Sequence, residues 1–309
     1  MRSGKKAIVT GGSGFIGGRL ISELLDNGYD VTAVIRDDNA ETPFPKDKVT
    51  IVNKDINDIT PDDFTSEDGY DVFFNLAWAG VSDPLKNDME LQIGNITMSM
   101  HTIEIAKRIG CRLFISSGTV AEYSYSDSVT DVDARQTPND MYGAAKTSVH
   151  YFLEVRARQL AQPFVWVVLP STYGERRRND NIITYTIKTL LGRGKPIYGK
   201  LEQMWDFLYV DDVARALRLV GEAGHPGKVY GIGSGVHKPL KEYIERIRDI
   251  IDPSLPLGIG DRPEMTGKTI CACINIDDLQ KDTGFTPKFT FDEGIERTIE
   301  WIMDTEGTS

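Results

Sequence analysis

Near its start the chain reads Lys5-Lys6-Ala7-Ile8-Val9-Thr10-Gly11-Gly12-Ser13-Gly14-Phe15-Ile16-Gly17. The residues up to Thr10 predict a buried strand, and apolar residues recur at helical spacing from Phe15 onward. A glycine-rich turn between a strand and a helix lets the backbone approach a phosphate, and the helix N-terminus supplies N–H donors. Gly11, Gly14 and Gly17 fit this GxxGxxG pattern. The segment therefore predicts a dinucleotide-binding turn.

Short apolar runs continue the pattern after this turn. Each is separated from the next by a helix or a loop, and each is nearly continuous in apolar residues: Val31–Ile35, Val49–Val52, Val72–Leu76, Leu113–Ser116 and Val165–Leu169. Such runs predict a parallel sheet with helices on both faces. The expected fold class is α/β, a Rossmann-type doubly wound parallel sheet.

The pattern loosens after Pro170. Further elements are expected as helices at Ile182–Leu191, Asp211–Glu222 and Leu240–Ile251, strands at Val229–Ile232 and Thr269–Ile276, and two closing helices. We expect residues 1–170 to form the NAD(P)-binding domain, with 208–236 returning to it. Residues 171–207 and 237–309 are expected to form a smaller, mixed α/β substrate-binding C-terminal lobe.

The bulk composition limits the classes of function. The 309 residues are 40% hydrophobic and 26% charged, which is ordinary for a soluble globular protein. A net charge of −11 argues against nucleic acid as a partner. No run reaches the roughly 18–20 apolar residues of a membrane span, and no signal-peptide core is visible, so a cytoplasmic protein is expected. The three cysteines and four histidines are not grouped as metal ligands, so no metal site is expected.

Tyr142 and Lys146 are spaced one helical turn apart, which places them on the same helix face. A nearby ammonium favours the phenolate and lowers the pKa of the phenol from about 10 toward the working range. On its own this spacing is common on helix surfaces. Combined with the upstream glycine-rich turn, it predicts a dehydrogenase.

The end of the second strand bears on the choice of cofactor. A basic residue there accommodates the 2′-phosphate of NADP, whereas an acidic residue binds the adenosine ribose of NAD. The strand Val31–Ile35 is followed by Arg36 and then Asp37. Arg36 favours NADP, and Asp37 would permit NAD if the register shifts by one residue.

The chain resembles the extended short-chain dehydrogenase/reductase family, which contains NAD(P)-dependent nucleotide-sugar epimerases, dehydratases and reductases. The resemblance runs almost end to end. The segments that carry it, in the family's order, are Thr10–Gly17, Asp55–Asp58, Asn75–Ala77, Ser116–Thr119, Tyr142–Lys146, Pro170–Gly174, Trp205–Val213, Gly284–Pro287 and Glu300-Trp301.

The resemblance implies three catalytic residues. Tyr142 would be the acid/base, and Lys146 would bind the nicotinamide ribose while lowering the tyrosine pKa. The third is a Ser or Thr four residues before a Tyr, which gives Thr119 when counted back from Tyr123. Counting forward from the strand gives Gly118, which has no hydroxyl group. Ser117 is the reserve.

The resemblance also implies a cofactor site. Asp55 would bind the adenine amino group, although Asp55, Ile56, Asn75, Ala77 and Tyr173 are equally explicable as turn or core residues. The expected cofactor-binding residues are Gly11, Gly14, Phe15, Ile16, Gly17, Arg36, Asp55, Ile56, Asn75, Ala77, Ser117, Tyr142, Lys146 and Tyr173.

Two departures from the family concern the substrate. Family dehydratases carry an acidic pair after the catalytic Thr, whereas this chain has Val120 and Ala121, with Glu122 one position further on. This argues against dehydration unless the loop shifts. The family's Arg-Asp-Phe segment begins here with Trp205, which can stack but cannot neutralise phosphate.

The positive charge for a diphosphate must therefore come from other residues. Arg262 matches a family Arg that reaches the diphosphate, whereas the triplet Arg176–Arg178 is either a second source or a solvated loop. The expected substrate-binding residues are Thr119, Arg176, Trp205 and Arg262.

The favoured reaction is reduction of a nucleotide-activated 4-keto sugar by NADPH. The alternative is a nucleotide-sugar 4-epimerase that keeps its NAD, and a third possibility is a cofactor-sensing protein without chemistry. The resemblance implies a homodimer formed through residues 91–108 and 142–160. Val149, Phe152, Leu153 and Leu160 could form an outer apolar stripe there, or could equally be core.

Overall fold

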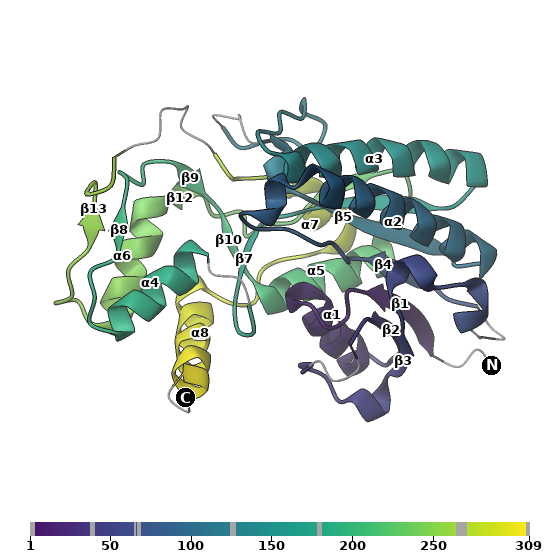
Figure 1. The fold of residues 1–309 in the computed structure, drawn as a ribbon, viewed down its shortest axis with the longest axis horizontal. Helices are drawn as coiled ribbons and strands as arrows, with labels where there is room; N and C mark the ends of the chain where they lie inside the picture. Colours follow the sequence, from purple (N-terminus) through teal and green to yellow (C-terminus); the bar gives the residue numbers. More distant parts are fainter. Residues whose placement is uncertain are drawn as a thin grey trace.

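The computed structural model describes residues 4–37, 41–64, 66, 69–123, 128–177, 181–263 and 271–306. Its centre is a parallel sheet of seven strands in the order β11-β6-β5-β4-β1-β2-β3 (Figure 1). The strands are β1 (Lys5–Thr10), β2 (Tyr29–Ile35), β3 (Thr50–Asn53), β4 (Val72–Asn75), β5 (Leu113–Thr119), β6 (Phe164–Leu169) and β11 (Val229–Gly231). The doubly wound sheet predicted from the sequence is confirmed.

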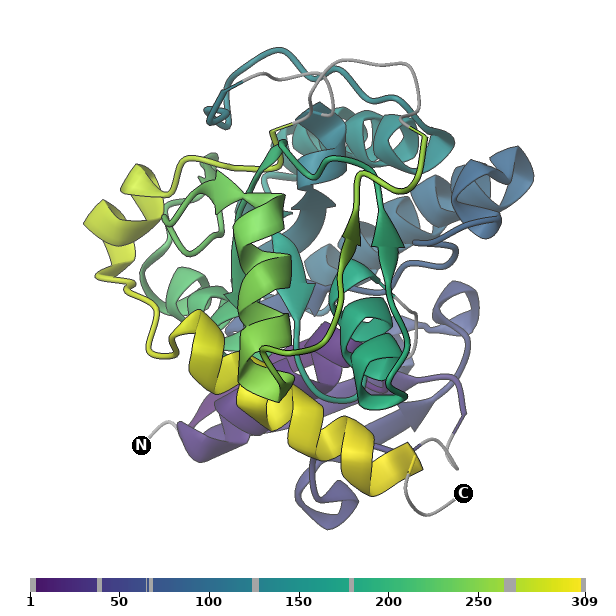
Figure 2. The same ribbon diagram turned by 90° about the vertical axis from the view of Figure 1, so that its left-hand side faces the viewer.

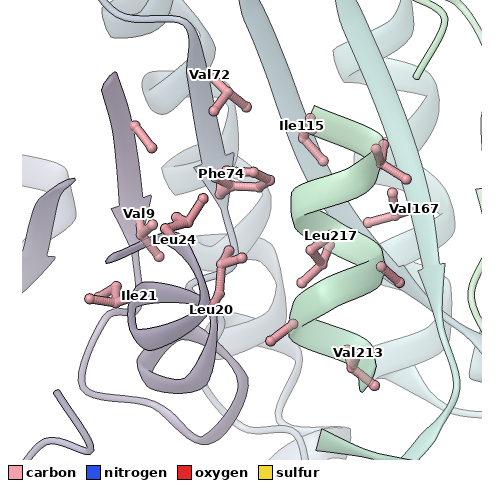
Figure 3. Packing of buried hydrophobic residues seen from close by; sticks show 14 of the residues in the cluster. Val9, Leu20, Ile21, Leu24, Val72, Phe74, Ile115, Val167, Val213 and Leu217 are labelled. Atoms are coloured by element: carbon pink, nitrogen blue, oxygen red, sulfur yellow. The ribbon is translucent and has the colours of Figure 1, made fainter. Parts of the chain in front are cut away.

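Helices cover both faces of this sheet. One face carries α1 (Phe15–Asp26), α5 (Val210–Ala223) and α7 (Asp277–Thr283), and the other carries α2 (Met89–Arg108) and α3 (Met141–Leu160). Figure 3 shows the first of these cores, where Leu20 and Leu24 of α1 and Leu217 of α5 lie against Val9 and Phe74 of the sheet. Successive residues of a strand face opposite sides, so the nearly continuous apolar runs are explained by burial on both faces.

A third hydrophobic core lies at the end of the molecule away from β1–β3 (Figure 1). Its helices are α4 (Ile182–Leu191), α6 (Leu240–Ile251) and α8 (Phe291–Glu306), and Figure 2 shows α6 and α8 facing the viewer. Three short strand pairs join it: β7 (Ser171–Tyr173) with β10 (Phe207–Tyr209), β9 (Met204–Trp205) with β12 (Lys238–Pro239), and β8 (Ile197–Tyr198) with β13 (Gly258–Ile259).

One expected strand is wrong in the part that the structure describes. Residues 271–276 form only isolated bridges, from Ala272 to Trp205 and from Ile274 to Thr130, because the segment passes from one neighbour to another without a continuous ladder. Short 3₁₀ helices occur at Lys46–Lys48, Ile56–Asp58, Pro61–Asp63, Leu85–Asn87 and Val120–Tyr123. Among the described helices, none has both the length and the apolar character needed to cross a membrane.

The strand order reverses between β1 and β4. In an open parallel sheet the carboxyl ends of the strands at such a reversal form a crevice that binds ligands. The glycine-rich turn follows β1, and Leu76 and Ala77 follow β4, so both segments lie at this crevice. The topology therefore places the predicted dinucleotide turn where a nucleotide can reach it.

Candidate active site

The glycine-rich turn forms a cradle that side chains would fill. Gly11 has a φ of +72°, and a Cβ there would lie 3.0 Å from the Cα of Ala77. A Cβ at Gly17 would clash with the carbonyl oxygen of Gly11. Gly14 is the N-cap of α1, and the helix begins at Phe15 and Ile16 with no acidic residue in its first turn. The bare backbone and the uncompensated helix N-terminus fit a dinucleotide phosphate.

A buried polar network holds the turn in place. The Thr10 hydroxyl donates to Asn75 Oδ1 at 3.1 Å, and Asn75 Nδ2 donates to Ser116 Oγ at 3.1 Å. The N–H groups of Leu76 and Ala77 donate to the Thr10 Oγ1 at 3.1 and 3.3 Å. Asn75 therefore joins the ends of β1, β4 and β5, and the network presses the Ala77 backbone against the glycine turn.

The residues expected around the adenosine lie at the ends of β2 and β3. Arg36 follows β2 and is exposed, as is Asp37. Asp55 Oδ1 accepts a hydrogen bond of 3.0 Å from the N–H of Asn57, so its side chain caps the turn after β3. Ile56 packs against the core beneath α2 and α3. The structure thus shows a capping role for Asp55 and a packing role for Ile56.

Tyr142, Lys146 and Thr119 come together at the end of β5. The Asp140 side chain accepts from the N–H of Gly143 at 2.7 Å and starts α3 one residue before Tyr142. Tyr142 is half-buried, and the Thr119 side chain lies in hydrogen-bonding range of its phenol. The buried Lys146 Nζ donates to the Ser117 carbonyl oxygen at 2.7 Å. Helix α3 and strand β5 together therefore bring the three predicted catalytic side chains to one place.

Burial sets the protonation of this cluster. It raises the pKa of Tyr142 to about 12, against which a hydrogen bond from Thr119 and the charge of Arg177 act. It lowers the pKa of Lys146 to about 7, against which the carboxylate of Glu122 acts. The sequence named Lys146 as the cation that lowers the tyrosine pKa. In the structure, the positive charge of Arg177 also acts on the phenol in this direction.

The cluster contains an aromatic side chain that the sequence analysis did not single out. Trp78 places its ring 3.8 Å from Lys146 Nζ and 6.2 Å, edge-on, from the ring of Tyr142. Its Nε1–H donates to the buried Gln92 Oε1 at 2.9 Å, which fixes the indole against α2. A tryptophan directly after Asn75-Leu76-Ala77 was the available signal, because that segment borders the cofactor crevice.

The sequence profile described as the NAD dependent epimerase/dehydratase family matches residues 7–233. The chain belongs to this family. It is therefore an enzyme of the extended short-chain dehydrogenase/reductase type, as the sequence analysis expected.

Relatives of more than one activity match nearly the whole chain. A dTDP-glucose 4,6-dehydratase from Escherichia coli is 26% identical, with 96% of this chain and 92% of that protein covered. A UDP-glucose 4-epimerase from Corynebacterium glutamicum is 24% identical, with 92% of each covered. Identity at this level is shared by dehydratases and epimerases and does not separate the two reactions.

Solved structures share the fold. The UDP-glucose 4-epimerase of Thermotoga maritima, with UDP-glucose, superposes with a TM-score of 0.84 at 23% identity, covering 97% of this chain and 99% of that one. The UDP-glucuronic acid 4-epimerase of Bacillus cereus, in complex with UDP-glucuronic acid and NAD, gives a TM-score of 0.84 at 24% identity, with the same coverage.

The loop that carries the acidic pair in the family's dehydratases is well defined here. Val120 and Ala121 form a 3₁₀ turn with Glu122 and Tyr123. The Glu122 side chain turns inward, where its Oε1 accepts a hydrogen bond of 2.8 Å from the N–H of Thr119. It is fully buried. The turn therefore does not shift so as to present Glu122 in place of the missing acidic pair.

The members of the triplet Arg176–Arg178 that the structure describes make different contacts. Arg176 has a left-handed φ of +66° and pairs with Glu41 at 2.7 Å. Arg177 lies 5.4 Å from the centre of the Phe15 ring and donates to the Thr172 carbonyl oxygen at 3.1 Å. Arg178 lies outside the described residues. Of the two described members of the triplet, Arg177 is the one that lies near both Phe15 of the turn and Tyr142.

The remaining predicted residues belong to the third core and its surface. The Trp205 ring lies 6.1 Å from that of Phe207. Tyr173 is buried there, and its hydroxyl donates to the Phe291 carbonyl oxygen at 3.1 Å, so the structure gives it a packing role. Arg262 is exposed just after β13. These side chains belong to elements other than β5 and α3, which carry the Tyr142 cluster.

Proposed function

We propose that the chain is a nucleotide-sugar 4-epimerase that keeps its NAD bound between turnovers. One observation carries the proposal: Thr119, Tyr142 and Lys146 lie together at the end of β5, while Val120 and Ala121 stand where the family's dehydratases are expected to carry an acidic pair. A cluster that moves a proton but lacks the eliminating acids suits epimerisation better than dehydration. The sequence favoured a reductase, whereas the folds reported above are those of 4-epimerases and the matching family is NAD-dependent.

The chain's own residues would hold the cofactor and handle the proton. The turn Gly11–Gly17 would bind the pyrophosphate, and Lys146 would bind the nicotinamide ribose. Bound NAD would supply the acceptor, and later the donor, of the hydride at C4 of the hexose. Tyr142 would take the proton of the C4 hydroxyl as the C4–H bond breaks, and would return it when that bond forms again on the other face. Thr119 would hold the sugar oxygen beside the phenol.

The phenol must lose its proton before it can act as a base. Burial opposes this loss, and Thr119 and Arg177 favour it. Arg177 is itself substantially buried, and its Nε has no hydrogen-bond partner in the described structure. We infer that Arg177 stabilises the phenolate of Tyr142 during the step in which the sugar is oxidised.

The substrate is inferred to be a nucleotide-diphosphate hexose. The two relatives whose structures are described above contain UDP-glucose and UDP-glucuronic acid, so UDP sugars are the first to test. We propose that residues 171–207 and 237–309 bind this substrate, with Trp205 stacking on it. Arg262 and the arginines after Tyr173 would supply the positive charge for the diphosphate.

A second candidate function is a 4-keto-sugar reductase that uses NADPH. Arg36 favours it, because an exposed arginine at the end of β2 suits the 2′-phosphate of NADP. The two functions share their catalytic residues, so they differ in what happens to the cofactor. A reductase consumes one NADPH per turnover, whereas an epimerase regenerates its NAD.

The test is to purify the protein, release its bound cofactor and identify it. The protein is then incubated with UDP-glucose, UDP-glucuronic acid and sugars of other nucleotides, and products are identified by NMR. We expect stoichiometric NAD and a C4 epimer formed with no net change in NADH absorbance. Release of NADP, or stoichiometric oxidation of NADPH with a 4-keto sugar, would overturn the epimerase and establish the reductase.

We also propose that the chain forms a homodimer through the outer faces of α2 and α3. Val149 and Leu153 belong to the core, so the apolar stripe expected on α3 is only partly external. Phe152 of α3 is 55% exposed and Ile93 of α2 is 54% exposed. Large apolar side chains exposed on two neighbouring helices indicate an interaction surface.

A further inference from the structure

Glu122 is a buried carboxyl group that the proposed chemistry does not use. Its exposed fraction is 0%, and its Oε1 accepts a hydrogen bond of 2.8 Å from the N–H of Thr119. Among the described residues its Oε2 has no hydrogen-bond partner, and the nearby indole of Trp166 acts to lower the pKa of the carboxyl group. Burying a carboxylate that is only partly satisfied is costly, and burial raises the pKa of Glu122 to about 7. A nearby positive charge offsets part of that cost.

Lys146 supplies that charge. Its Nζ donates to the carbonyl oxygen of Ser117, while Glu122 accepts from the N–H of Thr119. These two backbone groups flank Gly118, so the ammonium and the carboxylate are attached to neighbouring points of β5. Each favours the charged form of the other: Glu122 raises the pKa of Lys146, and Lys146 lowers that of Glu122.

The surroundings leave room for the carboxyl group, and the neighbouring histidine supplies no positive charge. A Cβ at Gly118 would clash with Glu122 Oε1 and with Trp166 Nε1, so the glycine makes space for the carboxyl group. The ring of His150 stacks on Trp166 with centroids 4.6 Å apart. Burial lowers the pKa of His150 to about 4, so this imidazole is neutral at physiological pH and cannot neutralise the carboxylate.

We propose that Glu122 is a positioning residue of the catalytic cluster. Its carboxylate is the buried counter-charge that favours the ammonium form of Lys146, and its hydrogen bond to the backbone fixes Thr119 beside Tyr142. The inference rests on the proposed function, because it assigns Glu122 to the same proton-transfer cluster. It gives the glutamate a role different from that of the acids that eliminate water in dehydratases.

The titratable groups facing Glu122 respond to it in a defined direction. The groups on α3 are Tyr142, Lys146 and the neutral His150. The group on the 3₁₀ turn is Tyr123, whose hydroxyl donates to the Val132 carbonyl oxygen. The negative charge raises the pKa of both Tyr142 and Lys146. Removing the charge of Glu122 should therefore lower the pKa of both groups.

The test is the substitution Glu122→Gln, which keeps the size and an oxygen for the Thr119 N–H but removes the charge. Lys146 is followed in the purified protein with its bound cofactor by ¹³C NMR of labelled lysine, and Lys146→Arg assigns the signal. The parent midpoint is expected near pH 7. In the variant it should fall by about one pH unit or more, which is tenfold or more in the ionisation constant, and the pH profile of turnover should move the same way.

A matched control is Asp212→Asn, which alters another buried carboxylate. Asp212 accepts the N–H groups of Lys288 and Phe289 and has no contact role in the cluster. This variant should lose thermal stability while the Lys146 midpoint stays in place. An unchanged Lys146 titration midpoint in folded Glu122→Gln protein would overturn the inference, because a glutamate with a purely structural role would not affect the pKa of Lys146.

The NMR measurement needs no turnover, so the inference and the proposed function fail separately. A parent protein without epimerase activity refutes the function, and an unmoved Lys146 midpoint refutes the role of Glu122. If Glu122→Gln does not fold, Glu122→Asp keeps the charge but shortens the reach to Thr119. The Lys146 midpoint should then stay within about half a pH unit of the parent, and a larger fall contradicts the inference.

Discussion

The ammonium of Lys146 lies 2.7 Å from the carbonyl oxygen of Ser117, to which it donates a hydrogen bond. This contact ties helix α3 to strand β5, one helical turn after Tyr142 and two residues before Thr119. The same Nζ lies 3.8 Å from the centre of the Trp78 ring. Lys146 therefore links α3 to β5 and helps to hold the phenol of Tyr142 close to the hydroxyl of Thr119.

The first prediction concerns the phenol itself. Tyr142→Phe removes the proton carrier, so we expect kcat to fall by roughly 10²- to 10⁴-fold while bound cofactor and fold are retained. The matched control is Tyr151→Phe on the same helix, where the hydroxyl is exposed and donates to Gln136 at 2.8 Å. A sugar turned over equally by the parent and by Tyr142→Phe would show that the catalytic assignment is wrong.

The second prediction concerns the glycine turn. A methyl group at Gly17 would clash with the Gly11 carbonyl oxygen, so Gly17→Ala should lose most of the bound cofactor and melt at a lower temperature. In Gly94→Ala, on α2, the new methyl would meet no atom within 4 Å. That control should keep its cofactor and gain up to about 1 kcal/mol in the free energy of unfolding. Equal cofactor content in the two purified variants would contradict the prediction.

Local patterns in the sequence predicted the features that depend on neighbouring residues. Gly11, Gly14 and Gly17 lie within one turn, and the spacing of Tyr142 and Lys146 places both on one helix face. Their proximity follows from spacing alone, so it could be predicted. Thr119 was predicted through the family resemblance, and the structure places it beside the phenol.

The contacts between distant segments could not be predicted in this way. Trp78 reaches Lys146 because the loop after β4 lies against α3, and no local pattern reveals that contact. The inward turn of Glu122 depends on the space above Gly118 and beside Trp166. The sequence pattern predicts a strand at Thr269–Ile276, yet the bridges of its described part go to different partners, which sequence periodicity cannot show.

The third prediction tests the homodimer. Phe152→Glu places a charge at the centre of the exposed apolar face of α3, and burying an unpaired charge is costly. We expect a dimer dissociation constant at least about tenfold larger, measured by analytical ultracentrifugation. Met303→Glu, on α8 and 56% exposed, is the matched control and should remain as dimeric as the parent. A Phe152→Glu protein with unchanged self-association would place the interface elsewhere.

The fourth prediction uses the pKa of Lys146, which burial lowers from 10.5 to about 7. Between about pH 8 and 10 the unfolded chain holds this proton and the folded protein has largely lost it, so the unfolding free energy rises with pH. The rise is at most about 1.4 kcal/mol per pH unit. The variant Lys146→Met has no such titration. Subtracting its unfolding free energy from that of the parent removes the contribution of tyrosines that titrate near pH 10 and are present in both proteins. Denaturant unfolding is measured at pH 8 and pH 10, and the unfolding free energy of the parent should rise relative to that of the variant. An equal free-energy difference at the two pH values would mean that Lys146 keeps an ordinary pKa.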